Sequence, residues 1–175
     1  MLAVAERTDG QAPRPKPDPT PAIARIAGIR VGVDTYKTLK ARLGPGAPMN
    51  GSRGYVWSWR AAQCLIRATF RSIPETPDAP VLDSDIVGAV SMERASKENL
   101  GNPNCPNVHG YVRQLGWLGG VIPGMSRAKL AAAVSRLPKP EEHGDEMIWR
   151  ATALGDTDLR WAAVIRLKDG KVAAI

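Results

Sequence analysis

Hydrophobic positions along the chain describe the same order of elements twice. Each copy begins with a short apolar segment that contains a glycine, at residues 29–33 and 121–125. Hydrophobic residues then recur at spacings of three and four, which is the pattern of a helix with one buried face. These residues are Tyr36, Leu39, Leu43, Leu130, Val134 and Leu137. We therefore expect one amphipathic helix in each half of the chain.

Residues that commonly begin and end helices flank both patterns. Asp34 or Thr35 can accept hydrogen bonds from the free amides of the first helical turn, and Ser126 can do so in the second copy. Gly44 ends the first helix, and Pro138 ends the second. These signals support the two helices that the hydrophobic spacing predicts.

Alternation of hydrophobic and polar residues after each helix predicts antiparallel strands. The expected strands cover residues 55–59, 64–70, 85–92, 147–151, 160–167 and 171–175. Asp169-Gly170 suits a tight hairpin turn between the last two. The sequence therefore predicts the α+β class, with two tandem repeats that are each a helical segment packed on a sheet of three to four antiparallel strands.

These patterns divide the chain into four parts. Residues 1–25 are expected to be a disordered tether, because proline at every second position from Pro13 to Pro21 removes backbone donors. A spacer is the favoured role for this arm, and a ligand for a proline-binding domain is the alternative. The other parts are repeat 1 (26–93), a turn-rich connector (94–117) and repeat 2 (118–175).

Composition and charge narrow the class of protein. The chain has 43% hydrophobic and 23% charged residues, as soluble globular proteins do. No run approaches the roughly 18 apolar residues of a membrane-spanning helix, so we expect no transmembrane segment. The formal net charge is +7, but basic residues are spread evenly along the chain rather than gathered in one arm. Nucleic-acid binding by a basic intracellular module is therefore kept as the alternative hypothesis.

The first residues resemble the end of an export signal. Residues 1–5, with the sequence MLAVA, end in the small-x-small pattern of signal-peptidase sites and precede a polar, proline-rich stretch. If an export signal was removed or truncated, the protein is periplasmic or secreted. Otherwise, we expect it in the cytoplasm.

The combined order of glycine, helix, Leu-Gly-Pro, tryptophan-bearing strand, apolar strand and Asp-Gly-Lys-Val resembles a known family. These are the SmpA/OmlA-like small envelope lipoproteins of outer-membrane assembly, whose unit occurs as a tandem pair in secreted, BLIP-like β-lactamase inhibitor proteins. The matching residues are Gly32, Leu39, Leu43, Gly44, Pro45, Trp57, Trp59, Gly124, Ser126, Leu130, Trp149, Asp169, Gly170 and Val172. The resemblance covers residues 26–93 and 118–175. It implies an antiparallel sheet packed on helices, with protein binding as its work. It does not imply β-lactamase inhibition, because the paired cysteines of each inhibitor copy are missing.

Candidate catalytic chemistry is sparse. The only histidines are His109 and His143, and neither has a cysteine or histidine at the spacing of a metal site. Ser126 lies in a segment similar to a nucleophile elbow, but that segment lacks the final glycine, and helix capping explains the serine. We therefore expect no catalytic residue, no metal, no cofactor and no enzymatic activity.

Aromatic and arginine residues remain as candidates for binding, because these types carry much of the energy of protein interfaces. Tyr55 and Trp59 share a strand face with Trp57, and a small sheet does not readily bury all three. The expected protein-binding residues are Tyr55, Trp59, Arg67, Arg150, Arg160 and Arg166. The sequence thus predicts a non-enzymatic bacterial envelope or secreted protein that binds another protein through its antiparallel sheet, as an assembly factor or in the manner of a hydrolase inhibitor.

Overall fold

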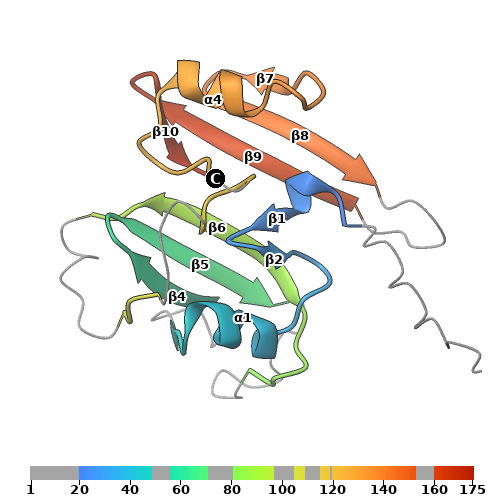
Figure 1. Ribbon diagram of the computed structural model, residues 1–175, viewed down its shortest axis with the longest axis vertical. Helices are drawn as coiled ribbons and strands as arrows, with labels where there is room; N and C mark the ends of the chain where they lie inside the picture. Colours follow the sequence, from blue (N-terminus) through green and yellow to red (C-terminus); the bar gives the residue numbers. More distant parts are fainter. Residues whose placement is uncertain are drawn as a thin grey trace, which may run out of the picture.

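A computed structural model describes residues 20–48, 56–70, 81–96, 105–108, 115–118, 120–152 and 160–175. Among these residues, the first half of the chain contains a 3-10 helix, a helix and six strands: η1 (Ala22–Ala24), β1 (Arg25–Ile26), β2 (Ile29–Arg30), α1 (Tyr36–Leu43), β3 (Ala47–Pro48), β4 (Val56–Ala61), β5 (Cys64–Phe70) and β6 (Val87–Arg94). The second half contains a helix and four strands: α4 (Arg127–Ala133), β7 (Glu141–His143), β8 (Glu146–Thr152), β9 (Arg160–Lys168) and β10 (Lys171–Ala174). Figure 1 shows their arrangement.

The predicted fold class, two α+β repeats with a separate sheet each, is wrong. The described part of the chain is mostly β, with one eight-stranded antiparallel sheet in the order β3-β4-β5-β6-β10-β9-β8-β7 and a two-stranded sheet of β1 and β2. The two halves join where β6 meets β10, at the Glu93–Ala174 pair. Met92 and Ile175 exchange two backbone hydrogen bonds of 2.9 Å beside it. Hydrophobic alternation reports which face of a strand is buried, but not which strand lies beside it, so the sequence did not reveal this junction.

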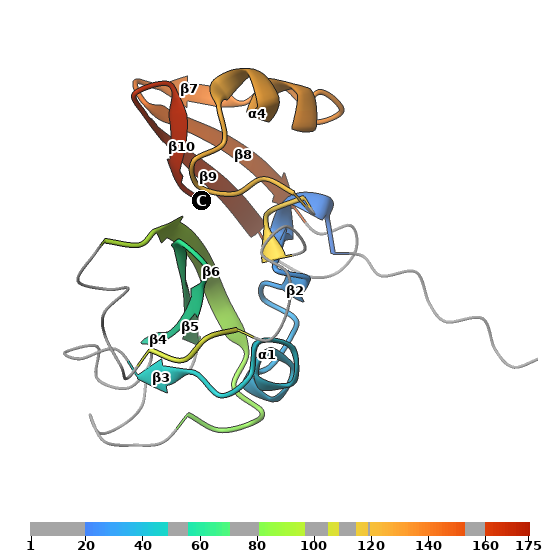
Figure 2. The ribbon, with the colours of Figure 1, turned by 60° about the vertical axis from the view of Figure 1, so that its left-hand side comes forward.

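One face of the large sheet carries both helices. Leu39 and Leu43 of α1 and Leu130 of α4 are fully buried in a single core with Trp59, Ile66, Met92, Trp149 and Ile165 of the strands. Figures 1 and 2 show α1 against the strands of the first half and α4 against those of the second. Side chains that alternate with the core residues point the other way. β9 shows this most clearly, since its residues are exposed and buried in strict alternation.

The β1–β2 hairpin of the first half packs against strands of the second half. The indole N–H of Trp161 on β9 donates to the carbonyl of Val31, at 2.7 Å. Trp117 donates to the carbonyl of Ile23 at 3.0 Å, and its ring lies 5.2 Å from that of Trp149. The first part of the predicted repeat 1 therefore lies in the core of the second half. The boundaries at 26–93 and 118–175 stay a prediction.

Local bonds at the two helix starts recur, although the sheet is shared. Gly32 and Gly124 both have a positive φ, of 82° and 91°. Their N–H groups donate to the carbonyls of Val87 and Val172, each at 2.7 Å. A positive φ is accessible to glycine at little cost, which explains why this residue stands at both places. Strand order recurs as well, since four antiparallel strands follow each helix and pair in chain order within the one sheet.

Both helices occur near their predicted positions, with different capping. The Ser126 side chain accepts a hydrogen bond from the Lys129 N–H, as expected for a cap. The Thr35 side chain forms no such bond, and Asp34 accepts the N–H and the side chain of Arg30 at 2.9 and 2.7 Å. α4 ends at Ala133, so Leu137 lies beyond it. No helix among the described residues has the length and apolar character needed to cross a membrane.

Candidate functional site

The side of the large sheet that faces away from the helices is the candidate site, and we call it the open face. Because directly paired residues of neighbouring strands point to the same side, the pairing identifies its members. The open face comprises Ala47, Val56, Ser58, Arg60, Leu65, Arg67, Thr69, Ala89, Ser91, Glu93, Glu141, His143, Glu146, Ile148, Arg150, Thr152, Arg160, Ala162, Val164, Arg166, Lys168, Lys171 and Ala174.

Four of the predicted binding residues lie on the open face. Arg67 is on β5, Arg150 on β8, and Arg160 and Arg166 on β9. Their positions alternate with buried residues, so the strand period turns each of them away from the core, and the pairing of the strands brings them to one surface. Sequence reasoning missed Arg60, Lys168 and Lys171, which share this face. The alternation at residues 56–61 and 160–168 contains the signal that places the first two there.

The prediction for Trp59 is wrong, because this residue lies under the helices. Its side chain is 0% exposed, and its indole N–H donates to the carbonyl of Gly44 at 2.9 Å. The ring covers Gly46 so closely that a side chain at this glycine would overlap it. The loop after α1 therefore covers the Trp59 ring, which the sheet alone does not bury. Tyr55 lies outside the described residues.

Lysine and arginine side chains on the open face outnumber acidic ones, seven to three. Three arginines form ion pairs with carboxylates on the neighbouring strand. The pairs are Arg67 with Glu93 at 2.8 Å, Arg150 with Glu141 at 3.1 Å and Arg166 with Glu146 at 2.9 Å. Arg160 and Lys168 have no carboxylate partner among the described residues. The face is therefore cationic, with ordered charge pairs at three places.

A gap interrupts the sheet at the centre of the open face, between β6 and β9. Both strands pair with β10, but β10 reaches only as far as the Arg166–Ala174 pair on β9 and the Met92–Ile175 pair on β6. Beyond those pairs, the described residues place no strand between β6 and β9. The gap ends at Val87, at the start of β6, because the Val87 carbonyl accepts from the Gly32 N–H and the Val87 N–H donates to the Asp34 carbonyl.

Backbone groups on both sides of the gap have no partner among the described residues. Hydrogen-bonding residues alternate along a strand edge, so Val90 on β6 faces the same side as Met92. By the same rule, Ala162 and Val164 on β9 face the same side as Arg166. No hydrogen bond joins these three residues to anything across the gap.

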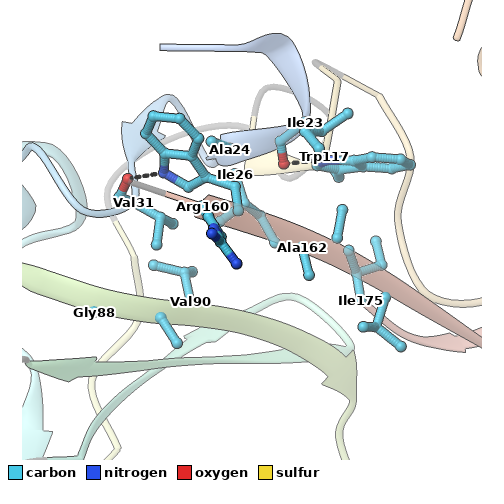
Figure 3. A pocket seen from close by; sticks show the side chains of 14 residues that line it. Ile23, Ala24, Ile26, Val31, Gly88, Val90, Trp117, Arg160, Ala162 and Ile175 are labelled. Carbon is cyan, nitrogen blue, oxygen red and sulfur yellow. Dashed lines mark hydrogen bonds between the residues drawn. The ribbon is translucent and has the colours of Figure 1, made fainter. Parts of the chain in front are cut away.

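The gap holds a cavity of about 160 Å³. Apolar side chains of the N-terminal segment form its floor, and Figure 3 shows Ile23, Ala24, Ile26 and Val31 around it. The guanidinium of Arg160 points from β9 toward β6 at the mouth of this cavity (Figure 3). The site thus combines an apolar floor, two unpaired strand edges and one cation.

The cysteines and histidines do not form a reactive centre in the described part of the chain. Burial raises the pKa of the Cys64 thiol, an effect that the nearby Arg94 partly opposes. Cys105 is also buried, and its Sγ lies 3.8 Å from the Oγ of Ser58 on the open face, whereas Cys64 faces the helices. Both cysteines are free thiols. No group of three His, Cys, Asp or Glu side chains among the described residues is arranged to hold a metal ion.

Comparison with known proteins found no match, neither among protein-family models nor among curated protein sequences or solved structures.

Proposed function

We propose that this protein binds another protein through the open face of its large sheet, and that the partner presents an acidic surface there. The observation that carries the proposal is a sheet face built from strands of both halves, on which seven lysine and arginine side chains stand against three carboxylates and which is most exposed along β9. An excess of charge of one sign favours a partner of the opposite sign and accelerates the encounter.

Side chains around the charges suit a protein surface as the partner. Val164 is 37% exposed, and Ile148 on the neighbouring strand is half-buried. Arginines beside small apolar patches are typical of the centres of protein interfaces. Rigid strands also hold these groups in place before binding, which lowers the entropic cost of association.

A nucleic acid is a poorer fit to the same face. Glu93, Glu141 and Glu146 lie beside three of the arginines and would repel phosphate groups. The described part of the open face also carries no Phe, Tyr or Trp side chain on which a base could stack. These two features favour a protein over a nucleic acid.

The proposal includes a location and a kind of role. The resemblance of the glycine, helix and tryptophan motifs to SmpA/OmlA-like and BLIP-like proteins supports a partner in the bacterial envelope or outside the cell. Within that setting, the protein acts by occupying a surface of its partner, as an assembly factor or an inhibitor does. We assign it no catalytic step.

Charge reversal on the open face tests the proposal. Proteins captured from the parent cell by the immobilised chain are identified, purified and titrated against wild type, Arg166→Glu and Lys129→Glu by calorimetry. Lys129 is an exposed residue of α4, so it controls for the change in net charge. We expect Arg166→Glu to weaken binding about tenfold or more, which corresponds to about 1.4 kcal/mol, while Lys129→Glu leaves it unchanged.

Two results would contradict the proposal. The first is a purified partner that binds wild type and Arg166→Glu equally well. The second is tight, salt-sensitive binding of a DNA or RNA duplex that Arg166→Glu abolishes, because this would make the open face a nucleic-acid site. The stability of Arg166→Glu is measured alongside, and only a small change is expected, because this ion pair is exposed.

A further inference from the structure

We propose that a cavity between the end of β6 and the segment before α4 binds a phosphate monoester with a small apolar body. The cavity, which we call the junction pocket, is lined by residues that include Cys64, Arg94, Ile122, Met125, Lys129 and Lys171. The inference goes beyond the proposed function. Arg94 pairs with Cys64, so this arginine faces the side of the helices and not the open face.

The junction pocket lies where β6 and β10 diverge. These two strands share only a short stretch of pairing. Toward its start, β10 pairs instead with the segment before α4, since the Gly124 N–H donates to the Val172 carbonyl at 2.7 Å and the Val172 N–H donates to the Met125 carbonyl at 2.8 Å. A cavity of about 640 Å³ lies between this segment and the ends of β5 and β6. Its volume is in the range of small-molecule sites.

Three cationic residues are among the described residues that line the pocket, and each belongs to a different element. They are Arg94 of β6, Lys129 of α4 and Lys171 of β10. None of the three has an ion-pair partner among the described residues, and the described lining contains no Asp or Glu. Gathered charges of one sign repel each other, so an anion in the pocket stabilises all three.

A phosphate monoester matches these cations better than a carboxylate does. Near pH 7 it has a charge of about −1.5 to −2 and three acceptor oxygens, whereas a carboxylate has one charge and two oxygens. A guanidinium such as that of Arg94 can bind two phosphate oxygens at once, and lysines bind phosphate as point charges. Three cations on three elements therefore suit a dianionic group.

Apolar residues in the same lining indicate that the ester has an apolar body. Pro123 and Cys64 are buried, and Ile122 and Met125 are half-buried. The described lining contains no Phe, Tyr or Trp, so a nucleobase would find no ring on which to stack. A short aliphatic body fits this surface better than a nucleoside does.

Three small molecules test the inference in the full-length protein. The probe is n-butyl phosphate, followed by amide chemical shifts in NMR. Pentanoate has the same butyl chain with a carboxylate, and inorganic phosphate lacks the chain. We expect n-butyl phosphate to shift the amide signals of Gly120, Gly124 and Met125 in a saturable way. Each of the other two should bind about tenfold more weakly, because it lacks the second charge or the apolar contact.

Variants with one charge removed examine the cations. Arg94→Gln and Lys129→Gln change exposed side chains, so the fold should persist while each weakens n-butyl phosphate binding about fivefold or more. Lys37→Gln, on an exposed residue of α1, is the matched control and should bind like wild type. A ligand that binds only the folded state also raises its melting temperature. This rise should be smaller in Arg94→Gln than in Lys37→Gln.

Vesicles distinguish two sources of a phosphate monoester. Wild type and Arg94→Gln are sedimented with phosphatidylcholine vesicles that contain phosphatidic acid. Co-sedimentation of wild type that Arg94→Gln loses would assign a lipid headgroup, and n-butyl phosphate binding without co-sedimentation would assign a free ester.

Four results would overturn the inference. These are no saturable binding of n-butyl phosphate, shifts confined to residues away from the junction pocket, equal affinity for pentanoate and n-butyl phosphate, or wild-type affinity in both Arg94→Gln and Lys129→Gln. The proposed function is tested separately, because Arg166 of the open face does not line the pocket in the described structure.

Discussion

Four tryptophans connect segments that are distant in sequence, because their indole N–H groups donate hydrogen bonds to backbone carbonyls. Trp59 and Trp149 donate to the carbonyls of Gly44 and Pro138, each at 2.9 Å, and Trp117 and Trp161 bond to the N-terminal segment. All four rings are buried. A buried indole N–H needs an acceptor, and a loop carbonyl needs a donor, so each of these contacts satisfies two groups at once.

The packing of Trp59 predicts the effect of one methyl group. Gly46→Ala should lower the free energy of unfolding by about 1–3 kcal/mol, because the new methyl group overlaps the Trp59 ring. Gly120→Ala is the matched control, since nothing lies within 4 Å of the added group there, and its change should be within about 0.5 kcal/mol. Urea unfolding followed by tryptophan fluorescence measures both. Equal effects of the two substitutions would contradict this picture of the loop.

Tyr36 predicts a loss of stability at high pH. Burial, with a smaller contribution from the negative charge of Asp83, raises its pKa to about 12. Below about pH 10 the phenol is protonated in both states and contributes nothing to the pH dependence. Above that pH the unfolded chain loses the proton while the folded chain keeps it until about pH 12. The free energy of unfolding should therefore fall as the pH rises through this window.

The Tyr36→Phe variant isolates this contribution. The difference in unfolding free energy between wild type and Tyr36→Phe should decline above about pH 10, by at most about 1.4 kcal/mol per pH unit. Denaturant unfolding at a series of pH values measures it. Parallel curves for the two proteins would show that the phenol titrates normally in the folded state.

At the scale of elements, the β1–β2 hairpin acts as a bridge between the halves. Ile26 forms an isolated bridge with Trp117, and the residue after β2, Val31, accepts the hydrogen bond from Trp161. The hairpin contains only two residue pairs, which by themselves do not make a stable sheet. Its position therefore depends on its packing against the strands of the second half (Figure 2).

Removal of the Trp161 hydrogen bond should loosen this hairpin. Trp161→Phe keeps a large apolar ring but leaves the Val31 carbonyl without its donor, at a cost of about 1–3 kcal/mol. We expect faster hydrogen exchange at residues 22–31, with little change in α1. Lys168→Ala, on an exposed side chain of the same strand, is the control and should leave exchange unchanged. Unaltered protection of the hairpin in Trp161→Phe would refute the bridging role.

At the scale of the whole molecule, one core extends through both halves. Buried residues of α1, α4, the hairpin and the large sheet belong to a single hydrophobic cluster. The sheet itself is continuous, although β6 and β10 share only a short stretch of pairing. Packing across the halves therefore contributes more to their union than the strand junction does.

A continuous core predicts cooperative unfolding. Fluorescence and far-ultraviolet circular dichroism should give coincident urea transitions for the full-length chain. A fragment of residues 118–175 should fail to fold, because it lacks Trp117 and the hairpin that cover Trp149 and Trp161. Two separate transitions, or a fragment with a sharp transition of its own, would support the division at residues 26–93 and 118–175 instead.

The candidate site shows how far sequence reasoning reached. Strand alternation predicted that Arg160 and Arg166 point away from the core, and the structure confirms this. Trp59 was misplaced because the loop that covers its ring comes from residues after α1, which the strand pattern does not contain. The gap had no sequence signal at all. It lies between β6 and β9, which only the pairing of distant segments brings to the two sides of β10.

The sequence by itself determined the local structure of this protein: where the two helices lie, which strand residues face inward, and where glycine permits a positive φ. These properties follow from periodicity and backbone sterics within a few residues. Only the tertiary structure decided that the strands form one sheet, that the N-terminal hairpin joins the core of the second half, and that a gap opens on the cationic face. Those features depend on which strand edges meet in space, and the residues of a strand carry little information about which other strand pairs with it.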